Sequence, residues 1–188
     1  MQVLLAHIRK FVSLSDEEAE TLMRYVRPLE VKKKEMLLRE GDICKEMLFV
    51  GKGCLRMYYI NEKGTEQITQ FALENWWLSD YTSYDRQQPA TFSIQAVEAS
   101  EVYAIAHDKQ DALTRALPQM ERYFRLILQK AYAAAQMRVF FFHNLNREEA
   151  YRQFSSMFPG FVQRIPQYML ASYLGLTPEY LSELRKKR

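Results

Sequence analysis

The sequence predicts an α+β protein, with an N-terminal antiparallel β-roll of the jelly-roll type and flanking helices, a long helix, and a C-terminal helix-turn-helix. Short β-type runs separated by turn residues fill residues 29–105. An apolar pattern of helical period follows, and the last twenty-odd residues have the spacing of two short helices joined by a tight turn. The 188 residues, 48% of them hydrophobic, suffice for one or two domains with a sizeable core. We expect the β-roll in residues 1–117, the long helix in 118–145 and the C-terminal domain in 146–188.

The N-terminal region begins with helical sequence and continues with strands. Ser15 and Glu18 form a capping box, and Pro28 is expected to end the helical pattern. Asn61 to Gly64 has the composition of a hairpin loop between two β-type runs. Regularly spaced strands favour a small antiparallel barrel or jelly roll. The expected strands are 36–38, 47–50, 54–60, 65–71, 92–97 and 101–105.

A short helix capped by Asp108 and a long helix over 119–145 should follow the strands. Apolar and small side chains recur along the long helix at alternating spacings of three and four, as in a coiled-coil seam. We therefore expect the helix to join two copies of the chain. The alternative is a core helix of a monomer that packs on one neighbour only. The predicted dimerisation residues are Met120, Phe124, Ile127, Ala131, Ala134, Arg138 and Phe141.

The C-terminal pattern predicts a helix-turn-helix after a helix that Asn146 and Glu149 can cap. Gly175 suits the left-handed end of the first helix, and Thr177 and Pro178 suit the N-cap and first position of the second. The second helix of such a motif enters the DNA major groove. The alternative is an ordinary helical hairpin inside a globular core.

The basic excess of the chain lies in this C-terminal quarter. From Leu145 on, seven Lys and Arg face four acids, whereas residues 1–144 carry 19 of each sign. That placement is expected of a segment that meets phosphates. Glu179 is a candidate to accept a hydrogen bond from cytosine N4, and Lys186 and Arg188 to contact phosphates. The predicted DNA-binding residues are Gln167, Thr177, Pro178, Glu179, Tyr180, Ser182, Glu183, Arg185, Lys186 and Arg188.

Other classes of protein find little support. Cys44 and Cys54 are too few for an iron–sulfur cluster or a four-thiolate zinc site, and the three histidines lack ligand spacing. No motif of a P-loop or a serine hydrolase occurs, so we do not expect an enzyme. No apolar stretch reaches transmembrane length and no signal peptide is visible, so we expect a cytoplasmic protein with no membrane partner.

The order of these elements resembles the Crp/Fnr family of bacterial transcription regulators over nearly the whole chain. The segments that carry the resemblance are Arg39-Glu-Gly-Asp42, Phe49-Val-Gly-Lys-Gly-Cys-Leu-Arg56 and residues 164–175. The resemblance implies a cyclic-nucleotide-binding-type β-roll, a homodimer along the long helix and an inverted-repeat operator bound by two helix-turn-helix units. It also makes RNA polymerase a candidate partner.

The sequence departs from the family at the effector pocket. In place of the Gly-Glu and Arg-Ser pairs that hold cyclic AMP, this chain has Ser79-Asp80 and Ala90-Thr91. Without a basic partner a buried cyclic phosphate is costly, so we expect no cyclic nucleotide and no other cofactor. Nearby aromatics, Trp77 among them, suggest either packing or an apolar effector. The candidate effector-pocket residues are Trp77, Ser79, Asp80, Ala90, Thr91 and Ala134.

Two further departures concern DNA binding. Glu183 stands where an arginine is common in the family, and the β-hairpin wing after the recognition helix is expected to be incomplete because the sequence stops at Arg188. The sequence thus predicts a dimeric, sequence-specific DNA-binding regulator. The alternative is a ligand- or protein-sensing module with degenerate DNA binding.

Overall fold

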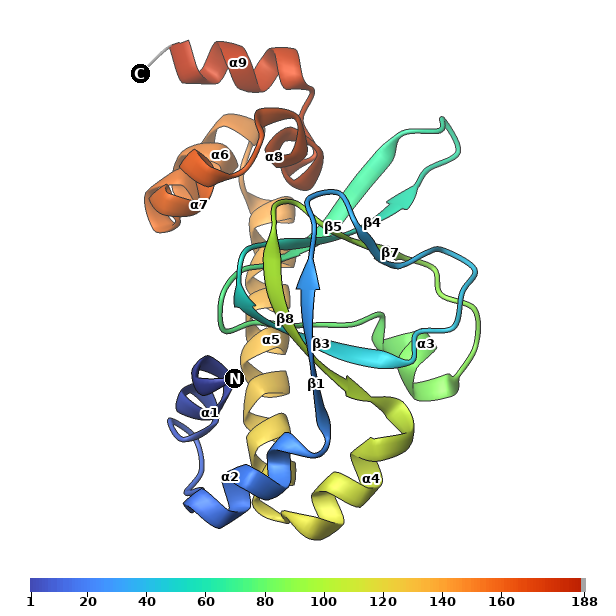
Figure 1. The fold of residues 1–188 in the computed structure, drawn as a ribbon. Coiled ribbons are helices and arrows are strands. Elements are labelled where there is room, and N and C mark those ends of the chain that lie inside the picture. The colour runs from blue at the N-terminus through green and yellow to red at the C-terminus, as the bar shows by residue number, and fades with distance from the viewer. Residues whose placement is uncertain (187–188) are drawn as a thin grey trace. The chain divides into compact units, whose positions relative to one another are not determined.

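The β-type runs of the sequence form two four-stranded sheets in the computed structural model, which describes residues 1–186 (Figure 1). One sheet has the strand order β1-β8-β3-β6, and the other has the order β2-β7-β4-β5. β8 is the antiparallel partner of both β1 and β3. The strands are β1 (Val26–Val31), β2 (Met36–Leu38), β3 (Glu46–Lys52), β4 (Leu55–Ile60), β5 (Glu66–Ala72), β6 (Trp77–Leu78), β7 (Ser93–Ala96) and β8 (Ser100–Ala106).

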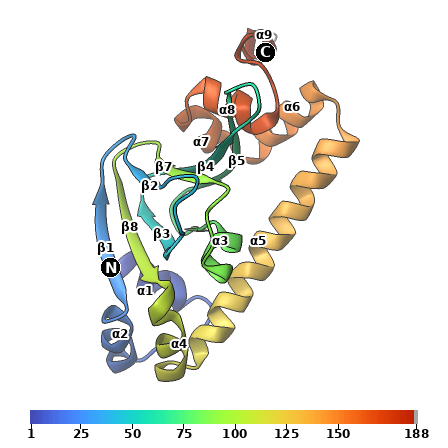
Figure 2. The same cartoon turned by 90° about the vertical axis from the view of Figure 1, so that its right-hand side faces the viewer.

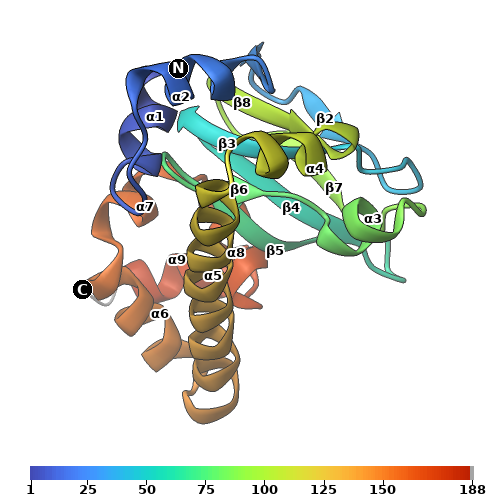
Figure 3. The same cartoon turned by 90° about the horizontal axis from the view of Figure 1, so that it is seen from below.

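The chain divides into two compact units. The first unit holds residues 1–59 and 69–128, and the second holds residues 60–68 together with the chain from Gln129 on. The helices of the first unit are α1 (Gln2–Ile8), α2 (Asp16–Met23), α3 (Tyr81–Arg86) and α4 (His107–Ala116). The long helix α5 (Gln119–Asn144) follows α4 directly and runs from the first unit into the second (Figures 2 and 3). The second unit ends with α6 (Arg147–Met157), α7 (Pro159–Arg164), α8 (Gln167–Leu174) and α9 (Pro178–Lys186).

Both predicted capping boxes are confirmed. The Ser15 hydroxyl accepts from the Glu18 backbone N–H at 3.1 Å, and the Glu18 carboxylate accepts from the Ser15 N–H at 2.8 Å. Asn146 and Glu149 form the same reciprocal pair at 3.0 and 2.9 Å. These side chains satisfy N–H groups that have no partner within the helix.

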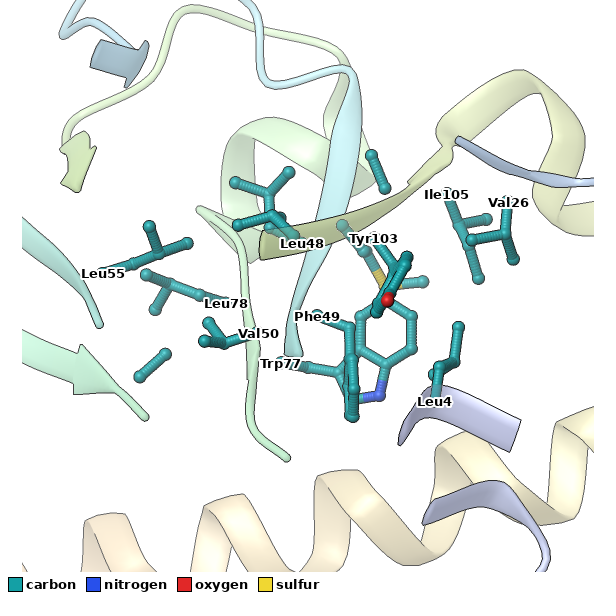
Figure 4. Close-up of a cluster of buried hydrophobic side chains, with 14 of the residues drawn as sticks. Leu4, Val26, Leu48, Phe49, Val50, Leu55, Trp77, Leu78, Tyr103 and Ile105 are labelled. Atoms are coloured by element: carbon teal, nitrogen blue, oxygen red, sulfur yellow. The ribbon is translucent and has the colours of Figure 1, made fainter. Parts of the chain in front are cut away.

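The core of the first unit has side chains on both faces of β3 (Figure 4). Leu48 and Val50 lie near Leu55 and Leu78, whereas Phe49 and Trp77 lie on the side of Leu4 of α1. All are buried. The alternation follows from the period of two along a strand, so a single strand serves two apolar layers.

The fold departs from the sequence prediction at Pro28 and at the start of α4, where the N-cap is Ala106 and Asp108 lies in the first turn of the helix. Pro28 lies within β1 rather than at the end of a helix, and an edge strand that pairs only with β8 tolerates a residue without an N–H. The Asp80 side chain caps the start of α3, and Arg86 is the last residue of that helix. After α6 a further short helix, α7, begins at Pro159, since proline suits a first helical position.

Candidate nucleic-acid interface

The predicted turn between the two C-terminal helices is confirmed in its details. Gly175 ends α8 in the left-handed conformation, with φ 67° and ψ 29°, and the Leu176 N–H donates to the Ala171 carbonyl at 2.9 Å. This hydrogen bond is the one expected of a Schellman motif. The Thr177 hydroxyl then accepts from the Tyr180 N–H at 3.2 Å and caps α9. The sequence therefore sets the geometry of the α8–α9 pair locally.

Apolar side chains of α8 and α9 face inward. Leu170 and Leu181 have no exposed surface, and Ala171, Leu176 and Leu184 are also buried. The exposed positions of α9 include Glu179 in the first turn and Arg185 and Lys186 in the last. Acids near the N-terminus and bases near the C-terminus suit the helix dipole.

Most of the predicted DNA-binding side chains lie on this outward surface. Tyr180 and Ser182 are half-buried, and Arg188 lies outside the described residues. The exposed residues are Gln167, Thr177, Pro178, Glu179, Glu183, Arg185 and Lys186. Because they are exposed, these side chains are accessible to DNA, and their contacts with it stay a prediction.

The candidate effector region of the first unit is organised by the buried carboxylate of Asp80. One carboxylate oxygen accepts from the Ser83 N–H at 3.1 Å, and the other accepts from the N–H groups of Thr91 and Phe92 at 3.0 and 3.2 Å. Ala90, between these segments, donates its N–H to the Asp42 carbonyl at 2.8 Å. The loop after α3 is therefore held to the start of α3 by an internal anion.

The other candidate effector residues have different environments. Ser79 and Ala90 are buried, and Thr91 is exposed. Ala134 is exposed and belongs to the second unit. Trp77 is buried and donates its indole N–H to the Tyr123 hydroxyl at 2.8 Å, so it serves the core of the first unit.

Comparisons with known proteins cover both the β-roll and the C-terminal helices. Residues 28–116 match the family model of the cyclic nucleotide-binding domain. The anaerobic regulatory protein of Pasteurella multocida is 28% identical over 190 residues, covering 92% of this chain and 67% of that protein. The transcriptional activator protein anr of Pseudomonas aeruginosa is 29% identical over 189 residues, covering 92% of this chain and 75% of that protein.

Among solved structures, FixK2 from Bradyrhizobium japonicum has the same fold, with a TM-score of 0.70 at 14% identity over 86% of this chain and 83% of that chain. In sequence and fold the chain is thus similar to transcription regulators of the Crp/Fnr family.

The long helix α5 is divided by burial into two parts. Met120 has no exposed surface, and Phe124 and Ile127 pack against the core of the first unit. Met120 therefore offers no surface to a second chain. Its spacing fits the predicted seam because a helix that packs on its own β-roll has the same period as one that packs on a partner. Further along, Ala131 and Phe141 are half-buried and Ala134 is exposed.

Large apolar side chains are exposed on the later part of the same helix. Tyr132 is 68% exposed, Val139 57%, Phe140 52% and Met137 49%. None of these four was among the predicted dimerisation residues, since the seam was drawn through the neighbouring positions. The sequence signal that could have found them is the apolar content of residues 132–140 as a whole.

Arg138, which interrupts the apolar pattern, has a partner within the second unit. Its guanidinium lies 4.4 Å from the ring centroid of Tyr173 of α8, a cation–π contact. Tyr173 also packs with Phe154 and Phe161. Burial raises the pKa of the Tyr173 hydroxyl, an effect that Arg138 partly offsets. The contact joins α5 to the helix-turn-helix, and sequence spacing alone gave no sign of it.

One cavity of about 470 Å³ opens in the first unit. Its apolar walls include Leu38, Leu48 and Ile94, and Cys44 and His107 also line it. The six predicted effector residues do not contribute to it. Within residues 1–186, no group of three His, Cys, Asp or Glu side chains is placed to hold a metal ion. No helix in that range has both the length and the hydropathy needed to cross a bilayer.

Proposed function

We propose that this chain binds an inverted-repeat operator as a homodimer, with α9 in the major groove of each half-site. The observation that carries the proposal is the α8–α9 pair, in which the leucines face inward and the polar side chains of α9 face outward. A helix of this kind, held by a tight turn on a supporting helix, matches the docking geometry of helix-turn-helix proteins.

The position of each polar group along α9 suggests its role. Glu179 lies in the first turn, the part of a recognition helix that meets base edges, and a carboxylate accepts from cytosine N4. Lys186 lies in the last turn and is exposed, which suits contact with a phosphate. Tyr180, the neighbour of Glu179, is half-buried.

The proposed dimer surface is the exposed apolar stretch of α5. This stretch exposes four large apolar side chains close together, those of Tyr132, Met137, Val139 and Phe140. Such a patch is unusual on a monomer, and a second copy of α5 would cover it. Twofold symmetry then places the centres of two half-sites about 10–10.5 bp apart, one helical turn.

The effector of the proposed regulator is not cyclic AMP. The N–H groups of Thr91 and Phe92 already donate to the Asp80 carboxylate, which is 2% exposed. A cyclic phosphate at this loop would bring a second negative charge beside that carboxylate, and neither Ala90 nor Thr91 can neutralise it. Like charges at close range in a buried site repel strongly.

Selection of bound sequences from random DNA duplexes tests the DNA-binding proposal. We expect an inverted repeat to be enriched. Glu179→Ala should relax the preference at one base pair in each half-site, at a cost of about 1–3 kcal/mol, whereas Glu62→Ala, which removes a glutamate outside α9, should not. Enrichment of an asymmetric site would contradict the dimer. No enrichment would favour a sensing module that does not bind specific DNA.

Isothermal titration with cyclic AMP tests the effector proposal. We expect no heat of binding at micromolar nucleotide. The double variant Asp80→Glu, Ala90→Arg restores the two side chains that the family uses and should gain measurable affinity. Micromolar binding to the unaltered chain would refute the proposal.

A further inference from the structure

A single residue of α8 is hydrogen-bonded to three consecutive residues of β5. The Ser172 hydroxyl accepts from the Ile68 N–H at 3.0 Å and donates to the Glu66 carbonyl at 2.9 Å. The Gln67 side-chain amide donates to the Ser172 carbonyl. These partners lie more than 100 residues apart in sequence, and all belong to the second compact unit. Residues 60–68 are thus built into the same unit as the helix-turn-helix.

The strand offers these groups because β5 is the last strand of its sheet. The backbone groups of Glu66 and Ile68 point to the same side, since the orientation alternates with a period of two along a strand. On an edge, an outward N–H and C=O have no neighbouring strand to bond with. Ser172 supplies both an acceptor and a donor from one hydroxyl, so it takes the place of a strand partner.

The contact leaves the proposed recognition surface open. Glu179, Glu183 and Lys186 are exposed while the Ser172 hydrogen bonds are formed. α8 is in turn joined to α9 through the Leu176–Ala171 hydrogen bond and the buried leucines. A group that holds α8 therefore also limits the movement of α9.

We propose that Ser172 is a positioning residue for DNA binding, through which residues 66–68 of β5 hold the helix-turn-helix in the arrangement that meets the operator. The inference rests on the proposed function, because the effect it predicts is on operator affinity. Its physical basis is conformational entropy, since a recognition helix already held in place loses less freedom on binding.

Operator binding by the Ser172→Ala variant of the full chain tests the proposal. Loss of the hydroxyl removes two hydrogen bonds, and we expect affinity for the selected operator to fall about three- to tenfold. Ser172→Thr keeps a hydroxyl and should restore most of the affinity. Ser156→Ala, the same change at an exposed serine of α6, should bind as the unaltered chain does. Gln67→Ala, which lies outside the helices, should weaken binding in the same direction.

Amide hydrogen exchange of Ile68 reports the contact without DNA. Its N–H donates to Ser172 Oγ, so exchange should be faster in Ser172→Ala and unchanged in Ser156→Ala. Equal operator affinity in Ser172→Ala despite faster Ile68 exchange would overturn the positioning role, and so would tighter binding, which would mark the contact as a restraint. Unchanged Ile68 exchange would show that the contact is not made. If the unaltered chain selects no operator, the proposed DNA-binding function fails, and the Ile68 result still reports on the contact by itself.

Discussion

The two halves of α5 use similar side chains in different surroundings. Before Leu128 the helix places Met120 and Tyr123 in the core of the first unit, where neither has exposed surface. After Gln129 it places Tyr132 and Met137 at the surface, 68% and 49% exposed. Each half therefore carries one methionine and one tyrosine, and both are buried in the first half and exposed in the second.

The difference shows what helical periodicity can and cannot specify. A stripe of apolar side chains means that a helix has a neighbour along that stripe. Spacing does not say whether the neighbour is the protein's own sheet or a second chain. In the first half Trp77 and α1 fill that role, through the ring contacts of Trp77 with Phe124 and of His7 with Tyr123. In the second half we propose that a copy of the helix does.

The methionine pair gives the largest expected effect. Met120→Ala removes a fully buried side chain and leaves a cavity, so it should lower the free energy of unfolding by about 2–5 kcal/mol. Met137→Ala, the same change in the exposed half, should lower it by much less in dilute protein. Urea unfolding of both variants at one protein concentration measures the difference. Equal losses would mean that the two halves are not distinguished by burial.

A charge on the exposed half should break the proposed dimer. Ala134→Glu brings two carboxylates together across a helix pair, and like charges at an interface cost several kcal/mol. Sedimentation at micromolar concentration should give about twice 22.3 kDa for the unaltered chain and the single mass for the variant. Lys109→Glu, at an exposed position of α4, should remain a dimer. A monomeric unaltered chain that still binds a palindromic site would contradict the proposal.

The sequence predicts best those features that depend on neighbouring residues. The Ser15 and Asn146 capping boxes, the left-handed Gly175 and the Thr177 cap were all predicted, because each is set by backbone needs within a few positions. The prediction at Pro28 was wrong because a proline is tolerated in β1 only if β1 is an edge strand, and only the assembled sheet determines that.

The candidate sites show the same limit. The sequence predicts Ser79-Asp80 and Ala90-Thr91 as candidate effector segments, but it does not predict that the Asp80 carboxylate accepts hydrogen bonds from residues 91 and 92. The Ser172 contact with β5 and the Arg138 contact with Tyr173 also join distant segments. A pattern within one helix carries no information on such pairs.

The tyrosine pair gives a smaller effect than the methionine pair. Tyr123→Phe removes the hydroxyl that accepts from the Trp77 indole at 2.8 Å and lies 2.9 Å from His7 Nδ1. A buried donor left without its acceptor costs about 1–3 kcal/mol. Tyr132→Phe, in the exposed half, should change the free energy of unfolding by less than about 0.5 kcal/mol. Thermal and urea unfolding of the two variants would reveal whether the hydroxyl in the core matters.

The smallest expected effect is that of alkaline pH on the difference in free energy of unfolding between the unaltered chain and Tyr123→Phe. Burial raises the pKa of the Tyr123 hydroxyl in the folded chain, although the hydrogen bond from Trp77 acts in the opposite direction. An unfolded tyrosine ionises near pH 10, so the unfolded state releases its proton first as pH rises. The contribution of Tyr123 to stability is therefore complete below pH 10 and declines above it, at a slope that approaches about 1.4 kcal/mol per pH unit.

Other buried tyrosines act in both proteins and cancel in the difference between the unaltered chain and Tyr123→Phe. The difference in free energy of unfolding should stay constant from pH 8 to 9.5 and should be smaller by about 1 kcal/mol at pH 10.5. A Tyr123→Phe curve that runs parallel to that of the unaltered chain throughout would show that the buried half of α5 imposes no penalty on ionisation.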